Sequence, residues 1–175
     1  MNPTAIRIRG LRVADRGDKG ISRPWGLDVE ALDLPSGERI LVLGERGSGK
    51  GALIDHVDRA LTRGRPEIVF SEEVTRARTR RVNGPDDVVP ECLLVLSEGH
   101  DFEKQKAILA RCAKGTTVLA SMDLCEIVGP EILAPFSCVV LMHEGHCVFA
   151  GSREAFVAAL VDLKRYLHAL ANMVP

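Results

Sequence analysis

One stretch constrains the fold of this chain more than any other: a glycine-rich loop that ends in a lysine. The loop lies between an apolar run at residues 39–43 and a segment, residues 52–61, whose apolar residues recur at helical spacing. A strand, a glycine-rich loop, a lysine and a helix, in this order, predict a phosphate-binding loop. An ordinary glycine turn is the alternative interpretation. The residues expected to contact phosphate are Gly44, Glu45, Arg46, Gly47, Ser48, Gly49, Lys50, Gly51 and Ala52.

The chemistry expected of this loop is anion binding. Glycines let successive backbone N–H groups turn toward a phosphate, the helix N-terminus adds positive potential, and the Lys50 ammonium supplies a point charge. The next position is Gly51, where a serine or threonine hydroxyl would bind magnesium, and Ala52 has no hydroxyl either. We therefore expect ATP or ADP to bind weakly, or to bind without being cleaved, and with little help from magnesium.

The composition is that of an ordinary soluble domain. The 175 residues suffice for one domain, residues 1–175, and 46% of them are hydrophobic while 27% are charged. A net charge of −1 gives no electrostatic reason to expect nucleic acid as a partner. No apolar run is long enough to span a bilayer, and the first residues lack the layout of a signal peptide. The five cysteines are scattered, without a C-x-x-C pair, which is typical of reduced thiols, so we expect a cytoplasmic protein.

Two strand patterns precede the phosphate loop and one follows its helix. Apolar and polar residues alternate at positions 5–9 and 25–34, which predicts half-exposed strands, and residues 67–70 can form a third short strand. Residues 71–90 have no clear pattern. They include a basic cluster, Arg76 to Arg81, that is either a clamp for phosphates or an acidic partner, or a solvated loop or helix face.

The second half of the chain alternates buried strands with helices. Residues 92–96 and 116–120 are apolar runs separated by a helical pattern at 101–114. Because helical segments separate them, we expect these strands and the 40–43 strand to be parallel. The predicted fold class is α/β, with a P-loop NTPase core, a mainly parallel sheet and an N-terminal antiparallel β extension.

The 92–96 strand ends in Ser97 and Glu98. In P-loop ATPases the strand beside the phosphate loop ends in a carboxylate that holds magnesium, often followed by a glutamate that activates the attacking water. Ser97 would occupy the metal position, so the sequence offers no metal ligand there. Glu98 remains in the base position, as the candidate catalytic residue of a vestigial site.

The end of the chain predicts a hairpin and a helix. Residues 139–142 and 147–150 flank Glu144 and Gly145, which favours a β-hairpin. His143 and His146 straddle this turn, so we interpret them as surface residues rather than metal ligands. Apolar residues then recur in alternating steps of four and three over a helix at about 152–173, which either docks on its own domain or forms a dimer seam. The apolar positions of this helix are Phe156, Leu160, Leu163, Leu167 and Leu170.

The order of elements and several phrases resemble the nucleotide-binding domain of ATP-binding cassette (ABC) transporters. Beyond the phosphate loop, the resembling phrases are residues 32–38, 92–98, 117–123 and 139–151. The resemblance covers nearly the whole chain and keeps the order of the family. Residues 99–106 are similar to the segment after the catalytic glutamate in capsular polysaccharide exporters. The resemblance implies ATP as cofactor and a protein partner in a membrane or envelope complex, or self-association through the C-terminal helix.

Departures from the family pattern predict the loss of hydrolysis. The stretch between Lys50 and Ser97 is too short for the helical subdomain that family members carry, and the signature sequence is lost with it. No glutamine loop is found, and the family's switch histidine falls on Met122. A transition state stabilised by metal and positioned charge should suffer severely from these losses.

Three functional interpretations remain open at this stage. The first is a degenerate ABC-type ATP-binding protein that acts as a scaffold or regulator in an envelope or export pathway. The second is an active ATPase subunit of an exporter, completed by a partner. The third is a small P-loop kinase, although a threonine would be expected where Ala52 stands.

Overall fold

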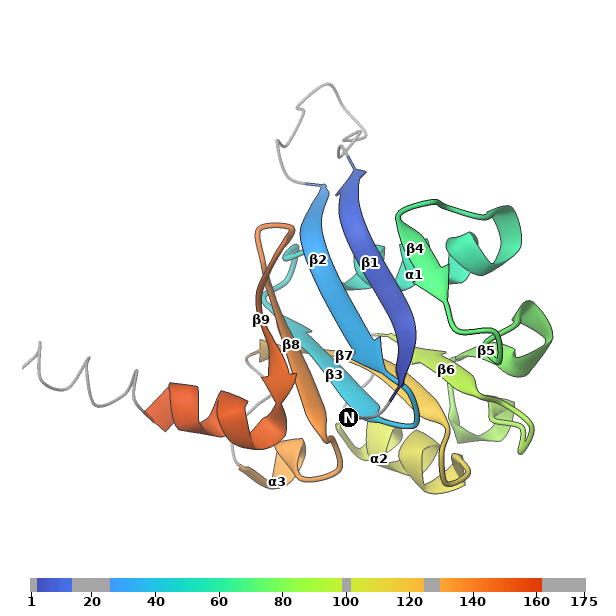
Figure 1. Ribbon diagram of the computed structural model, residues 1–175. Helices are drawn as coiled ribbons and strands as arrows, with labels where there is room; N and C mark the ends of the chain where they lie inside the picture. The colour runs from blue at the N-terminus through green and yellow to red at the C-terminus, as the bar shows by residue number, and fades with distance from the viewer. Residues whose placement is uncertain (1–2, 14–25, 99–101, 125–129, 162–175) are drawn as a thin grey trace, which may run out of the picture.

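The computed structural model of the chain describes residues 3–13, 26–98, 102–124 and 130–161. Figure 1 shows the long strands β1 and β2 side by side, with β4 next to β1. A further helical segment, residues 153–161, follows β9. The elements, in chain order, are β1 (Thr4–Val13), β2 (Leu27–Pro35), β3 (Arg39–Gly44), α1 (Lys50–Arg63), β4 (Ile68–Phe70), the 3₁₀ helix η1 (Arg76–Arg78), β5 (Thr79–Val82), the 3₁₀ helix η2 (Pro85–Asp87), β6 (Leu94–Ser97), α2 (Phe102–Arg111), β7 (Thr117–Asp123), α3 (Pro130–Leu133), β8 (Cys138–His143) and β9 (His146–Ser152).

The strands of the described residues form one nine-stranded sheet, in the order β4-β1-β2-β9-β8-β3-β7-β6-β5. Its core is parallel: β3 pairs with β7 and β8, β6 pairs with β7, and β5 pairs with β6. At the other end, β1 pairs antiparallel with both β2 and β4. This confirms the predicted α/β fold, the parallel direction of β3, β6 and β7, and the antiparallel N-terminal extension.

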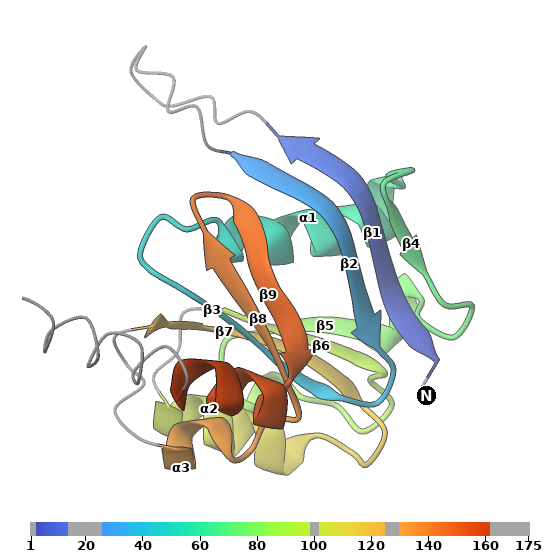
Figure 2. The same ribbon diagram turned by 60° about the vertical axis from the view of Figure 1, so that its left-hand side comes forward.

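The core strands are buried on both faces because helices cover both sides of the sheet. Figure 2 shows α1 on one side of β3 and β7, with α2, α3 and residues 153–161 on the other. Successive side chains of a strand point to opposite faces. Accordingly, Ile40 and Val42 pack in the core that contains α1, whereas Leu41 and Leu43 pack in the core that contains α2 and Phe156. This two-sided burial explains why β3 reads as a continuous apolar run.

Two details of the sheet were not predicted from the sequence. The strand order places β7 between β6 and β3. Residues 79–82 were interpreted as part of a loop or helix face, but they form the edge strand β5. The pattern of this strand does not alternate, because Arg80 and Arg81 are both exposed and only Thr79 and Val82 are buried. It therefore could not be recognised as a strand from its residues.

The chain between α1 and β6 carries no α-helix. It contains the short strands β4 and β5 and two single-turn 3₁₀ helices. All of its residues are described, so the predicted absence of a helical subdomain at this place is confirmed. The sheet therefore ends at β5, which is an edge strand, and η2 packs near α2.

The β8–β9 hairpin has the predicted turn, and its tip contacts the phosphate loop. Glu144 and Gly145 both have positive φ angles, 45° and 81°, as a tight two-residue hairpin turn requires. The N–H of Gly145 donates to the carbonyl oxygen of Ser48 at 3.0 Å, and its own carbonyl accepts from the N–H of Asp28, also at 3.0 Å. A β-carbon on Gly145 would lie 2.4 Å from the carbonyl oxygen of Gly26, so only glycine fits. The hairpin thus connects the phosphate loop to the start of β2.

Candidate functional site

The phosphate loop has the local geometry that the sequence predicts. It leaves β3 at Gly44, and Gly47 and Gly49 take positive φ angles of 86° and 96° that favour glycine. α1 then begins at Lys50, without an acidic residue in its first turn and without a side-chain cap on its N-terminal N–H groups among the described residues. The N–H groups of a first helical turn have no partner within the helix. They are therefore available to an anion, which the helix dipole also favours.

Ser48 occupies the tightest part of the loop. A β-carbon on Gly44 would lie 2.1 Å from the Ser48 hydroxyl oxygen and 2.6 Å from the carbonyl oxygen of Met142. The Ser48 hydroxyl is buried and has no hydrogen-bond partner among the described residues. Buried hydroxyls are normally paired, so an unpaired one in an anion-binding loop is consistent with a ligand that supplies the partner.

Lys50 contacts two groups of the protein. Its Nζ lies 2.5 Å from Oδ1 of Asp123 and donates a hydrogen bond to the carbonyl oxygen of Glu45 at 3.0 Å. Asp123 is the last residue of β7, and it pairs in register with Gly44 at the carboxyl end of β3. The carboxyl ends of parallel strands are where α/β proteins bind ligands. A carboxylate therefore holds the lysine that the sequence assigns to phosphate.

Glu98 follows β6 and lies directly against the phosphate loop. A β-carbon on Gly51 would approach its Oε1 to 2.1 Å, so the carboxylate fills the space in which a serine or threonine would hold magnesium. The other oxygen of Glu98, Oε2, accepts from Arg81 of β5, which also donates to Asp55 of α1. The hydrogen bond to Asp55 raises the pKa of the Arg81 guanidinium. The negative charge of Glu98, the candidate base, is thus balanced by the guanidinium of Arg81.

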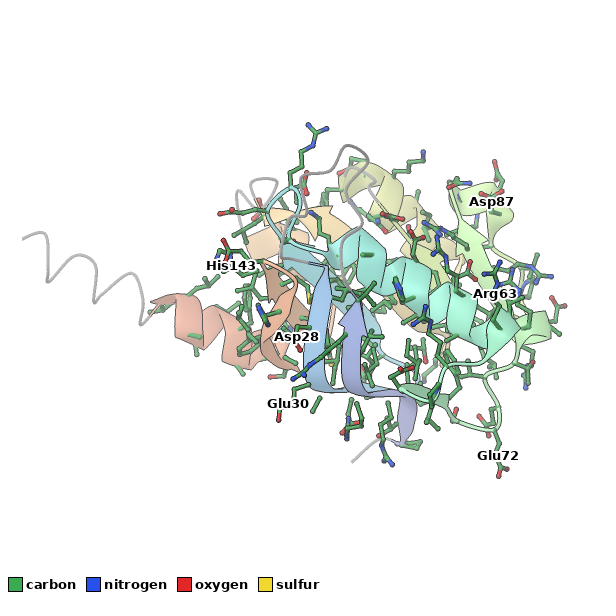
Figure 3. All side chains as sticks on the ribbon, turned by 90° about the horizontal axis from the view of Figure 1, so that it is seen from above. Asp28, Glu30, Arg63, Glu72, Asp87 and His143 are labelled. Carbon is green, nitrogen blue, oxygen red and sulfur yellow. The ribbon has the colours of Figure 1, made fainter. Side chains whose placement is uncertain are left out.

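A cavity of about 800 Å³ joins these groups, and its size falls within the range of small-molecule sites. It extends from the phosphate loop along α1 to the ends of β1 and β2. Figure 3 shows α1 from above, and the labelled Arg63 marks the C-terminal end of this helix, away from the phosphate loop. The cavity is lined by Val13, Gly26, Leu27, Arg46, Gly47, Gly49, Lys50, Gly51, Ala52, His56, Glu98, Ser121 and Asp123.

Most of the predicted site residues meet in this cavity. Arg46, Gly47, Gly49, Lys50, Gly51, Ala52 and Glu98 line it, whereas Gly44, Glu45 and Ser48 shape the loop beneath. Three further polar residues of the lining were not predicted as site residues: His56, Ser121 and Asp123. Asp123 could have been found from its place at the carboxyl end of a buried strand, the usual position of ligand-binding residues in parallel sheets. His56 carries a weaker signal, as a polar residue on the buried face of α1.

The two positions that usually complete catalysis point elsewhere. Ser97 is fully buried, and its hydroxyl has no partner among the described residues. Met122 is 1% exposed and packs in the core that contains α2, on the side of the sheet opposite α1. No group of three or more metal-ligating side chains occurs within the described ranges. Gly51 and Ser97 thus lack the hydroxyl and the carboxylate that hold magnesium at the corresponding positions of a P-loop ATPase.

The remaining sequence features lie outside the cavity. In the basic cluster, Arg76 pairs with Asp58 of α1 and Arg81 pairs with Asp55 and Glu98, so these cations are used within the chain. His143 and His146 are exposed at the turn of the hairpin. In the C-terminal helix Phe156 is buried against Phe149, with ring centroids 5.4 Å apart, while Leu160 is exposed. The predicted positions beyond residue 161, and residues 99–101, lie outside the described ranges.

Comparison with solved structures assigns the fold. The chain aligns with CbiO1 from Clostridium perfringens, part of the ABC transporter complex CbiONQ, at 15% identity and a TM-score of 0.62, covering 94% of this chain and 95% of that one. A nucleotide-free ATP-binding cassette from an ABC transporter aligns at 14% identity and 0.63, covering 93% and 97%. A bacterial Atm1-family ABC exporter with ATP bound aligns at 11% identity and 0.59, covering 99% of this chain and 43% of the exporter.

These similarities show that the chain has a P-loop α/β fold. More specifically, its fold is that of the nucleotide-binding domain of ABC transporters, shortened by the missing helical subdomain. The sequence matches no protein-family model and no curated protein. At these identities the solved structures establish the fold alone.

Proposed function

We propose that this chain is an ABC-type ATP-binding protein that binds nucleotide with little or no hydrolysis. The observation that carries the proposal is the position of Glu98. Its carboxylate occupies the place of the missing metal ligand at Gly51 and pairs with Arg81. A base that is held by an arginine, beside a phosphate loop without metal ligands, cannot readily accept a proton from water.

Nucleotide binding is supported by the parts of the site that need no metal. These are the uncapped N-terminus of α1, the positive-φ glycines of the loop, the Lys50 ammonium and the cavity beyond them. Backbone N–H groups and a lysine act directly on phosphate oxygens. Binding of ATP or ADP should therefore depend on Lys50 and be nearly indifferent to magnesium.

The cellular role that we propose is a scaffold or regulator in an envelope or export pathway, reached through a protein partner. The support is the fold, since the solved structures of the same fold are parts of ABC transporters. Polysaccharide export is the narrower proposal, and it rests only on the likeness of residues 99–106 to capsular polysaccharide exporters. No helix of the described residues is long and apolar enough to cross a membrane. We propose a cytoplasmic location, with attachment to the membrane through the partner.

The decisive experiment combines a binding assay with a turnover assay. Calorimetric titration of ATP into the protein, with magnesium and then with a chelator, should give similar dissociation constants. Lys50→Ala should weaken binding roughly tenfold or more, the scale of a charge-assisted hydrogen bond. Phosphate release over many turnovers should stay at background. Equal affinity of the wild type and Lys50→Ala would refute nucleotide binding at this loop.

The active-subunit interpretation is the second candidate, because Glu98 and Lys50 line the same cavity. It predicts steady, magnesium-dependent phosphate release that disappears in Glu98→Gln. That result would replace the proposal of a non-hydrolysing protein. Arg81→Ala is the matched control in the turnover assay, since it frees Glu98 without removing its carboxylate.

A further inference from the structure

α1 carries a buried histidine, one ring nitrogen of which is without a hydrogen-bond partner in the described part of the chain. His56 is 7% exposed, yet it lines the cavity together with Val13 and Leu27. Its Nδ1 lies 2.8 Å from the carbonyl oxygen of Ala52, one helical turn earlier. A carbonyl oxygen only accepts hydrogen bonds, so Nδ1 carries the proton of this bond. In the neutral imidazole Nε2 is therefore an acceptor. Among the described residues it has no hydrogen-bond partner.

Packing alone does not account for a histidine at this position. Val13, Leu27 and Ala52, which also line the cavity, are apolar, and an apolar side chain would fill the place of His56 without a polar atom to satisfy. The hydrogen bond to Ala52 fixes the imidazole in one orientation and one tautomer. A polar side chain that is held in this way, at the wall of a cavity, is arranged to meet a hydrogen-bond donor of a ligand.

The distance along α1 indicates which part of a nucleotide reaches His56. The first-turn N–H groups, at Lys50, Gly51 and Ala52, are those available to phosphate. His56 lies one turn further, about 5–6 Å along the helix axis. In a nucleoside triphosphate, the group that follows the phosphates at this distance is the ribose, whose hydroxyls are donors. The base lies further still from the phosphates.

We propose that His56 is a specificity residue for the sugar of the bound nucleotide, with Nε2 accepting a hydrogen bond from a ribose hydroxyl. This inference rests on the proposed nucleotide-binding function. It predicts that the site distinguishes ribonucleotides from deoxynucleotides, a property that the phosphate loop alone does not confer, because phosphate contacts are the same in both.

The test measures a ratio of affinities rather than one affinity. Dissociation constants for ATP, 2′-deoxy-ATP, 3′-deoxy-ATP, inosine triphosphate and inorganic tripolyphosphate are compared in one buffer. The wild type should bind one of the two deoxy compounds roughly threefold to tenfold more weakly than ATP, the scale of one neutral hydrogen bond. Inosine triphosphate, which lacks the adenine amino group but keeps the ribose, should bind like ATP.

Two variants of His56 separate recognition from folding. His56→Phe keeps the ring but removes the acceptor, so ATP and the deoxy compounds should bind it equally. His56→Gln places an amide oxygen near the position of Nε2 and should retain part of the discrimination. Tripolyphosphate should bind all three proteins alike.

The outcomes are separable. Discrimination that persists in His56→Phe, or a wild type that binds ATP and both deoxy compounds equally, would overturn the assignment to His56 while leaving the phosphate site intact. Weak binding of inosine triphosphate with full binding of the deoxy compounds would assign His56 to the base and also overturn the proposal. Absence of tripolyphosphate and ATP binding would refute the proposed function itself, and this inference with it.

Discussion

The ion pair between Lys50 and Asp123 gives the sharpest test of the site. The Asp123 carboxylate holds the ammonium that a phosphate would use, at 2.5 Å. It also adds a negative charge next to the place where the phosphates of a nucleotide would bind. Replacing it in Asp123→Asn removes both effects, so the affinity for ATP should rise.

The magnitude follows from the exposure of the pair. The Lys50 side chain is 13% exposed and that of Asp123 is 37% exposed, so the pair is neither a free surface pair nor a buried one. Hydrogen bonds between charged groups contribute about 1.5–3 kcal/mol, and solvent screening reduces this toward the range of exposed pairs. A gain of about 1–2 kcal/mol, or roughly fivefold to thirtyfold in affinity, is expected.

The assay is titration calorimetry of ATP, run in the presence of a chelator and repeated with magnesium. Four proteins form a double-mutant cycle: the wild type, Asp123→Asn, Lys50→Ala and the double variant. The gain from Asp123→Asn should be clearly smaller when Lys50 is absent, because only the repulsion between the carboxylate and the phosphates remains to be relieved.

The reasoning would be refuted by a loss of affinity in Asp123→Asn. If the loss appeared only with magnesium, Asp123 would be a metal ligand, and the absence of ligands at Gly51 and Ser97 would have been given too much weight. An equal gain with and without Lys50 would show that the ion pair does not restrain the lysine.

Three further predictions concern stability. Gly51→Ser should change the free energy of unfolding by less than about 1 kcal/mol, because the better helix propensity of serine offsets the displaced Glu98–Arg81 pair. Calorimetric melting of Gly51→Ser, Glu98→Gln and the double variant tests this. Glu98→Gln should change the melting temperature less when serine is present at position 51. Gly145→Ala should lower the free energy of unfolding by about 1–3 kcal/mol, because the φ of Gly145 is 81° and the new β-carbon would meet a backbone oxygen. Gly84 has an extended backbone and open space around it, so Gly84→Ala should be nearly neutral in the same denaturant titration. The hydrogen bond from Arg9 lowers the pKa of Asp33 below its ordinary value of 3.8. This pair therefore stabilises the fold at pH values above 3.8, and its contribution is lost as the pH falls through the folded pKa. Asp33→Asn should lower the melting temperature slightly at neutral pH and leave it unchanged in acid.

The parts of the fold that could be predicted have a strong local pattern. β3 is a continuous apolar run because both of its faces are covered, and α1 repeats its buried residues at helical spacing. The hairpin was predictable from Glu144 and Gly145, whose turn needs positive φ. In each case the residue pattern and the physical requirement lie within the same few residues.

The parts that could not be predicted depend on residues that are distant in sequence. The position of β7 between β3 and β6 is set by strand order, and no local pattern encodes it. The short strand β5 has only four residues, and two of them are exposed arginines. The same limit applies to the site. Glu98 was predicted as a residual base, but its pairing with Arg81 and its position against Gly51 require the fold.

The contact between the hairpin tip and the phosphate loop has a consequence during protein synthesis. Ser48 belongs to the first third of the chain, whereas Gly145, which donates to its carbonyl oxygen, is made close to the end. At about 5–20 residues per second, the loop exists for roughly 5–20 s before this partner is synthesised. The two strands that pair with β3, β7 and β8, are also synthesised later than β3. The nascent chain therefore carries an apolar strand without its neighbours for seconds, and the contact between the hairpin tip and Ser48 can form only after β8 and β9 have emerged.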